Sequence, residues 1–121
     1  MSVRRLMVAF ALVIAVVGIG ASSVLGAGSK VQKTTIKVTA TDALKFTLSK
    51  KTAPAGVVSF VVTNKGVAKH DFWIAGKKTP LLGHNATKTV TVTLAKGKSY
   101  PFKCTVAGHA AAGMKGTFKA T

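Results

Sequence analysis

The segment YPFKCTVAGHAAAGMKG, residues 100–116, carries one Cys, one His and one Met in the pattern Cys-x4-His-x4-Met. The residues that lead up to Cys104 place Tyr, Phe and Cys on one face, which is typical of a half-buried strand. A strand that ends at Cys104 points its thiol toward one end of a core. Because the loop that follows is short, it can return His109 and Met114 to the same point. The segment therefore predicts a β fold with a binding site at its end.

The donor atoms of this segment favour copper. Thiolate and thioether are soft donors that suit Cu(I), and imidazole serves both oxidation states. Two His and one Cys in a trigonal set, with a weak and long axial Met, form the blue-copper arrangement. We take His70 as the second His, because it follows a turn and lies on a predicted strand on the same side as Phe72 and Ile74. The predicted metal ligands are therefore His70, Cys104, His109 and Met114.

Each of these residues also has a simpler interpretation. A lone Cys in an apolar strand is commonly an inert buried thiol, and a lone His or Met can serve packing. Cys104 and His109 could act as nucleophile and base, but His70 and Met114 would then have no role, so we predict no catalytic residue and no enzyme. A zinc site is also possible, but Met is an unusual ligand for zinc. The remaining class is a copper-free adhesion or structural module. His84 lies in a predicted loop, and we expect it at the surface.

The rest of the chain reads as strands separated by turns. Period-two alternation with β-branched residues is the signature of a half-buried strand. Strands are predicted at 35–40, 45–48, 57–63, 70–74, 87–94, 99–104 and 116–120. Turn residues separate them, and the longest irregular stretch is 75–86. This pattern predicts an all-β, antiparallel Greek-key sandwich or barrel of about seven to eight strands.

Residues 1–27 differ from everything after them. Arg4 and Arg5, the only arginines, precede an apolar run over 6–21 and a stretch of small residues. This order is that of an export signal peptide. The alternative is an uncleaved N-terminal membrane anchor through residues 6–25, although the apolar run is shorter than the roughly 20 residues of a spanning helix. Either way, we expect domain 28–121 to be exported and periplasmic or otherwise extracytoplasmic.

Composition excludes several other classes. The chain has 121 residues, a single Cys, and only Asp42 and Asp71 as acids. One Cys permits neither an intramolecular disulfide framework nor a Cys-rich zinc fold. A chain with two acids is a poor match for hydrolases that use a pair of carboxylates and for calcium sites that use several. With 48% hydrophobic residues, the chain is also too apolar for intrinsic disorder.

The charge balance points to the kind of partner. Removing Arg4 and Arg5 takes the formal charge from +16 to +14 for residues 28–121. The lysines are spread along the chain, whereas nucleic-acid binding favours clustered Arg and Lys with a groove-reading element, so we expect no nucleic acid. We expect a monomer whose charge steers it toward an acidic redox partner, with an anionic membrane surface as the second possibility.

The motifs together resemble those of the cupredoxins, the blue copper family that includes plastocyanin, azurin, auracyanin and sulfocyanin. The segment from Asn64 to Phe72 is similar to the family's first-ligand region, and Cys104, His109 and Met114 match its C-terminal ligand loop in order and spacing. The resemblance implies a Greek-key sandwich with one type 1 copper. It assigns His70 and His109 as imidazole ligands, Cys104 as the thiolate and Met114 as the axial thioether.

The resemblance also implies a function. It is one-electron transfer, with Cu(I)/Cu(II) cycling and the outer edge of His109 as the electron entry and exit point. A copper carrier or storage protein is the alternative. Two positions depart from the family pattern: Asp71 stands where Asn is common, and Ala107 where Pro is common. A carboxylate at position 71 would favour Cu(II) and lower the reduction potential if it pointed inward.

Overall fold

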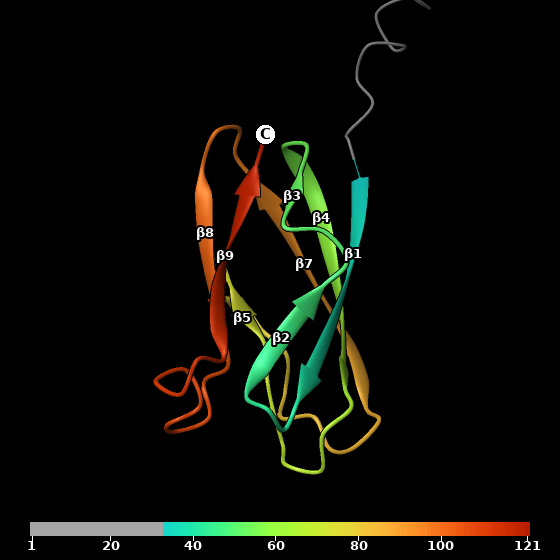
Figure 1. The fold of residues 1–121 in the computed structure, drawn as a ribbon. Helices are drawn as coiled ribbons and strands as arrows, with labels where there is room; N and C mark the ends of the chain where they lie inside the picture. The colour runs from blue at the N-terminus through green and yellow to red at the C-terminus, as the bar shows by residue number, and fades with distance from the viewer. Residues whose placement is uncertain (1–32) are drawn as a thin grey trace, which may run out of the picture. The chain divides into compact units, whose positions relative to one another are not determined.

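The computed structural model describes residues 33–121, which form strands joined by turns and loops, in two facing sheets and without a helix (Figure 1). The predicted signal or anchor segment and the boundary at residue 27 lie outside the described residues. The strands are β1 (Lys33–Thr41), β2 (Lys45–Leu48), β3 (Thr52–Ala53), β4 (Gly56–Asn64), β5 (Trp73–Ile74), β6 (Lys77–Lys78), β7 (Thr87–Leu94), β8 (Ser99–Lys103) and β9 (Lys115–Ala120). One sheet has the order β2-β1-β4-β7, and the other has the order β3-β9-β8-β5-β6.

Alternating side chains explain why these segments form strands. In β7, Val90, Val92 and Leu94 are buried while the threonines between them are exposed. Across the sheet, Phe60 of β4 lies opposite Val90, and both side chains point into the sandwich. On the outer face the Ser59 hydroxyl hydrogen-bonds the Thr91 hydroxyl at 2.9 Å. Each strand therefore has an apolar face for the core and a hydroxyl-rich face for water.

Phenylalanine rings fill the space between the two sheets. Phe60 and Phe118 come from opposite sheets and meet edge to face, with ring centroids 5.1 Å apart. Phe72 lies against Phe60, Phe46 and Phe102, with centroid distances of 5.5, 5.2 and 5.5 Å. Edge-to-face and tilted arrangements are the favourable ones for aromatic pairs. These contacts join the first-ligand segment, through Phe72, to the centre of the core.

The predicted all-β sandwich is confirmed, with one difference in strand direction. Both sheets are mixed, because β1 pairs with β4 and β3 pairs with β9 in parallel. The reason is topological: β2 and β3 return the chain to the end at which β1 began, so β4 runs the same way as β1. The predicted strand over 70–74 is shorter, since β5 holds only Trp73 and Ile74, and His70 forms an isolated bridge with Leu82.

Three connections meet at one end of the sandwich. They are the β1–β2 turn, the β4–β5 connection over 65–72 and the β8–β9 loop over 104–114, which lie together at the bottom of Figure 1. Segments far apart in sequence thus gather where the predicted ligands lie. Within residues 33–121, no helix has the length and apolar character needed to cross a membrane.

Candidate metal centre

The loop after β8 folds back on itself, as the sequence predicted. Cys104 is fully buried, and its backbone N–H donates to the Met114 carbonyl at 3.1 Å. The Met114 N–H in turn donates to the His109 carbonyl at 3.0 Å. Cys104 and Met114 pack with Ala40 of β1 in a small apolar cluster. Two backbone hydrogen bonds therefore hold all three predicted ligands of this loop in one place.

His70 comes from the β4–β5 connection, where backbone pairing fixes it. Its N–H donates to the Leu82 carbonyl at 3.2 Å, and its carbonyl accepts from the Leu82 N–H at 2.8 Å. The Asn64 side chain braces the same region, because its amide donates to the carbonyls of Ala68 and Leu82 at 2.8 and 2.7 Å. The His70 side chain is fully buried. Its position is therefore set by the protein before any metal binds.

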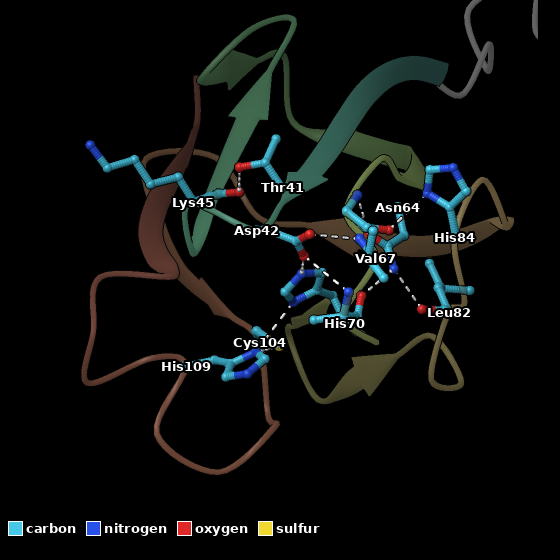
Figure 2. Close-up of polar contacts among 12 residues, drawn as sticks. Thr41, Asp42, Lys45, Asn64, Val67, His70, Leu82, His84, Cys104 and His109 are labelled. Atoms are coloured by element: carbon cyan, nitrogen blue, oxygen red, sulfur yellow. Dashed lines mark hydrogen bonds and ion pairs between the residues drawn. The ribbon is translucent and has the colours of Figure 1, made fainter.

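The donor atoms of three predicted ligands converge. His70 Nδ1 lies 3.2 Å from His109 Nδ1, and Cys104 Sγ lies 3.5 Å from the same nitrogen. All three donor atoms lie within 4.8 Å of one another. Figure 2 shows His70 and His109 facing each other beside Cys104. Two imidazole nitrogens and one sulfur form the trigonal donor set of a blue-copper site, so the residues present fit a copper ion.

The fourth predicted ligand, Met114, and His84, which was expected at the surface, differ in placement. Met114 is fully buried in the cluster that holds Cys104, next to the converging donors, and its role as fourth ligand remains a prediction. His84 is exposed, and its Nδ1 lies 2.9 Å from the Gly66 carbonyl, so it takes no part in the donor group.

Asp71 connects the two ligand segments. Its carboxylate is 3% exposed, and it accepts hydrogen bonds from the Thr105 N–H at 2.6 Å and from the Thr105 hydroxyl. Asp71 follows His70 in the chain, and Thr105 follows Cys104. The Asp71 side chain therefore holds the His70 segment next to the Cys104 segment. Both carboxylate oxygens of Asp71 thus bind the Cys104 loop.

Sequence reasoning assigned no role to Asp42, which lies in the β1–β2 turn. Its carboxylate accepts from the Val67 N–H at 2.7 Å and from the Ala68 N–H at 3.1 Å. Its Oδ1 also lies 3.3 Å from Nε2 of His70, on the side away from His109 (Figure 2). The one sequence signal that could have found it is scarcity, because the chain has only two acids.

The protein shifts two ionisation equilibria near the site. Burial raises the pKa of the Cys104 thiol, so the metal-free protein holds the proton on sulfur more firmly than an exposed Cys does. Hydrogen bonds, chiefly from the Val67 N–H, lower the pKa of the Asp42 carboxyl. Asp42 is therefore a carboxylate at neutral pH. A metal ion that bound the Cys104 sulfur would have to displace its proton.

Of the converging donors, only His109 reaches the surface. It is half-buried, whereas His70 and Cys104 are fully buried. The residues near it in the loop are small and exposed: Ala107, Gly108, Ala111, Ala112 and Gly113. Lysines 69, 103 and 115 near the ligands in sequence are also exposed. The member of the donor group that solvent reaches thus lies in a loop of small, exposed residues.

Comparisons with known proteins agree with this geometry. A family model described as copper binding proteins of the plastocyanin/azurin family matches residues 23–121. A dithionite-reduced auracyanin from Roseiflexus castenholzii superposes with a TM-score of 0.64 at 21% identity, covering 76% of this chain and 99% of that chain. No curated protein matches.

Two further auracyanins have the same fold. Auracyanin B superposes with a TM-score of 0.61 at 23% identity, covering 78% of this chain and 96% of its own. Auracyanin A from Chloroflexus aurantiacus, described as a "blue" copper protein, superposes with a TM-score of 0.61 at 19% identity, covering 74% and 100%. At these identities the likeness establishes the fold.

We predict that alkylation of Cys104 in the metal-free protein is slow at neutral pH and accelerates only at alkaline pH. Burial disfavours the thiolate, which is the reactive form. Mass spectrometry of iodoacetamide-treated samples over a pH series gives the rate without ambiguity, since the chain has one Cys. The midpoint of the pH–rate profile should lie above that of the same chain in urea, and an equal or lower midpoint would contradict the prediction.

We also predict that Asp71→Ala lowers the free energy of unfolding of the metal-free protein by about 1.5–3 kcal/mol, the range for loss of hydrogen bonding to a charged group. Asp71→Asn is the matched control, because an amide can accept from the Thr105 N–H and donate to its hydroxyl. Urea denaturation measures both variants, and hydrogen exchange at the Thr105 amide should be faster only in the Ala variant. Equal losses in the two variants would show that the Thr105 bonds are unimportant.

Proposed function

The chain belongs to the plastocyanin/azurin family of copper-binding proteins, the cupredoxins, and on this premise we propose that it is an exported blue copper protein that carries single electrons between redox partners. The observation that carries the proposal is the convergence of His70 Nδ1, Cys104 Sγ and His109 Nδ1 at one end of the sandwich. Copper is the cofactor that this donor set and this family both indicate.

In the proposed site, His70, Cys104 and His109 would hold one copper ion, and the Met114 thioether would be the fourth ligand. Bound copper supplies a one-electron couple between Cu(II) and Cu(I). The burial of Met114 beside Cys104 supports its assignment, because no other buried Met is present among residues 33–121. The thioether adds a soft donor without charge, which suits the reduced state of the ion.

The protein's part in electron transfer is to keep the ligands still. His70 is fixed by its backbone bridge to Leu82, and Cys104 by its bond to the Met114 carbonyl. Asp71 ties these two segments together through Thr105. Ligands that are already in place need little movement when the charge of the site changes. A rigid set of buried ligands is better suited to electron transfer than to the exchange of copper with an acceptor, which is the alternative function.

Electrons should enter and leave through the exposed edge of His109. It is the only member of the converging donor group that is not fully buried. The small exposed residues of the loop allow a partner surface to approach this edge closely. Close approach matters because a docked partner must exclude water and bring its own redox centre near the imidazole.

The charge of the domain supports an acidic partner. Residues 28–121 carry a formal charge of +14, and Lys69, Lys103 and Lys115 are exposed. Complementary charge raises association rates and orients the encounter. We propose that the protein acts as an exported monomer, freed from or anchored by residues 1–27. An anionic membrane surface would attract the same lysines.

We predict that the purified protein binds one Cu(II) per chain and develops the intense blue absorption of a thiolate–copper site. Cys104→Ser should abolish the colour because it removes the thiolate. His84→Ala is the matched control and should keep the full colour, since this His lies outside the donor group. Met114→Leu should keep the colour and shift the reduction potential, which the axial ligand tunes.

Absorption spectroscopy during copper titration checks these outcomes. A colourless wild-type protein, or a blue Cys104→Ser variant, would refute the proposal. Transfer of copper to an added chelator or acceptor protein within the time of an electron-transfer cycle would favour the carrier or storage function instead.

We further predict that oxidation of the reduced protein by anionic ferricyanide slows steeply with added salt, because salt screens the attraction to the lysines. Stopped-flow measurement with a cationic oxidant is the matched control and should give the opposite salt dependence. A flat dependence with both reagents would exclude electrostatic steering at the His109 edge.

A further inference from the structure

We propose that Asp42 is a positioning residue for the metal centre, which fixes the orientation and tautomer of His70 and strengthens its imidazole as a donor. The proposal rests on the proposed copper function. It assigns a role to a charged side chain that contacts His70 and is not bonded to the Cys104 loop. Figure 2 shows Asp42 and His109 on opposite sides of the His70 ring.

The two nitrogens of His70 face different groups. Nδ1 lies 3.2 Å from His109 Nδ1, in the converging donor group, and Nε2 lies 3.3 Å from Asp42 Oδ1. An ionised carboxylate can only accept hydrogen bonds, so it requires a proton on Nε2. That proton leaves the lone pair on Nδ1 free to bind a metal. Asp42 therefore selects the tautomer that the site needs.

Asp42 is itself held in place although its side chain is 47% exposed. The Val67 N–H donates to Oδ2 at 2.7 Å, and the Ala68 N–H donates to Oδ1 at 3.1 Å. The backbone of the β4–β5 connection thus wraps around the carboxylate. Oδ1 accepts one hydrogen bond from the Ala68 N–H and can accept a second. His70 Nε2 lies where it can donate that second bond.

Gly66 provides independent support for this close fit. A Cβ at this position would lie 2.2 Å from Asp42 Oδ1, so any other residue here would push the carboxylate out of its present position. Gly66 is buried, and its N–H donates to the Asn64 side chain at 2.8 Å. The glycine is therefore needed so that the backbone can approach the carboxylate. The connection that carries His70 is built around Asp42.

A purely structural role would need only the two backbone contacts. The third contact, to His70, adds negative charge beside a metal-binding imidazole. Such charge makes Nδ1 a stronger donor and favours the more highly charged oxidation state of a bound ion. Carboxylate partners of metal-bound His typically change metal affinity 10- to 100-fold when they are removed.

The first experiment compares Asp42→Asn with wild type in the copper-loaded protein. Asn keeps the shape and an acceptor oxygen for His70 Nε2, but it removes the charge and the acceptor that faces the Val67 N–H. We expect Cu(II) affinity to fall about tenfold or more while Cu(I) affinity changes less. A tenfold difference corresponds to a rise of about 59 mV in the reduction potential of a one-electron couple. Protein-film voltammetry and copper competition titrations measure the two quantities.

Ala43→Lys is the matched control. Ala43 is exposed and follows Asp42 directly, so this change adds the same +1 to the net charge without removing a hydrogen bond. It should shift the potential much less than Asp42→Asn does. Equal shifts in both variants would mean that only long-range charge acts, and the proposal would be wrong.

A second readout needs no copper. NMR of the metal-free protein should show the Nε2–H tautomer of His70, with slow exchange of that proton, in wild type. Asp42→Ala should give a mixed tautomer and fast exchange. If Asp42→Asn and Asp42→Ala change only the free energy of unfolding, and neither the potential nor the tautomer, Asp42 is a loop brace and the proposal fails. If wild type binds no copper, the proposed function fails first, and the tautomer still shows whether Asp42 orients His70.

Discussion

The hydrogen bonds that Asp71 accepts from Thr105 join the two segments on which the centre depends. Asp71 follows His70, and Thr105 follows Cys104, although the two segments are 34 residues apart. The pairing of β5 with β8 continues the same alignment, with Trp73 opposite Lys103. Because one buried side chain and one strand pair set the same register, the nitrogen and the sulfur are placed together by the fold itself.

Much of the fold could be predicted because its strands are long and one-sided. The run of β7 alternates from Thr89 to Leu94, and its prediction was confirmed. The two-residue strands β3 and β6 were missed, since two residues carry no period. The parallel pairing of β1 with β4 was also missed, because direction depends on how far the intervening chain travels and not on local pattern.

The sequence predicted those parts of the site whose residues lie at a recognisable spacing in the chain. The intervals between Cys104, His109 and Met114 indicated a shared point, and the loop does fold back. Asp42 carries no such signal, since its partners are backbone N–H groups 25 and 26 residues away and a histidine 28 residues away. Asp42 contacts the His70 side chain, and Asp71 follows His70 in the chain. The two negative charges of this strongly basic domain therefore lie next to the proposed metal centre.

The order of the strands has a consequence for how the centre is assembled. The sheet β2-β1-β4-β7 consists wholly of residues 33–94, whereas three of the four proposed ligands come after residue 100. During synthesis, which begins at the N-terminus, the chain can therefore complete one sheet before Cys104 is made. Cys104 then arrives at a preformed apolar wall beside Ala40, and the reactive sulfur is covered as soon as β8 docks.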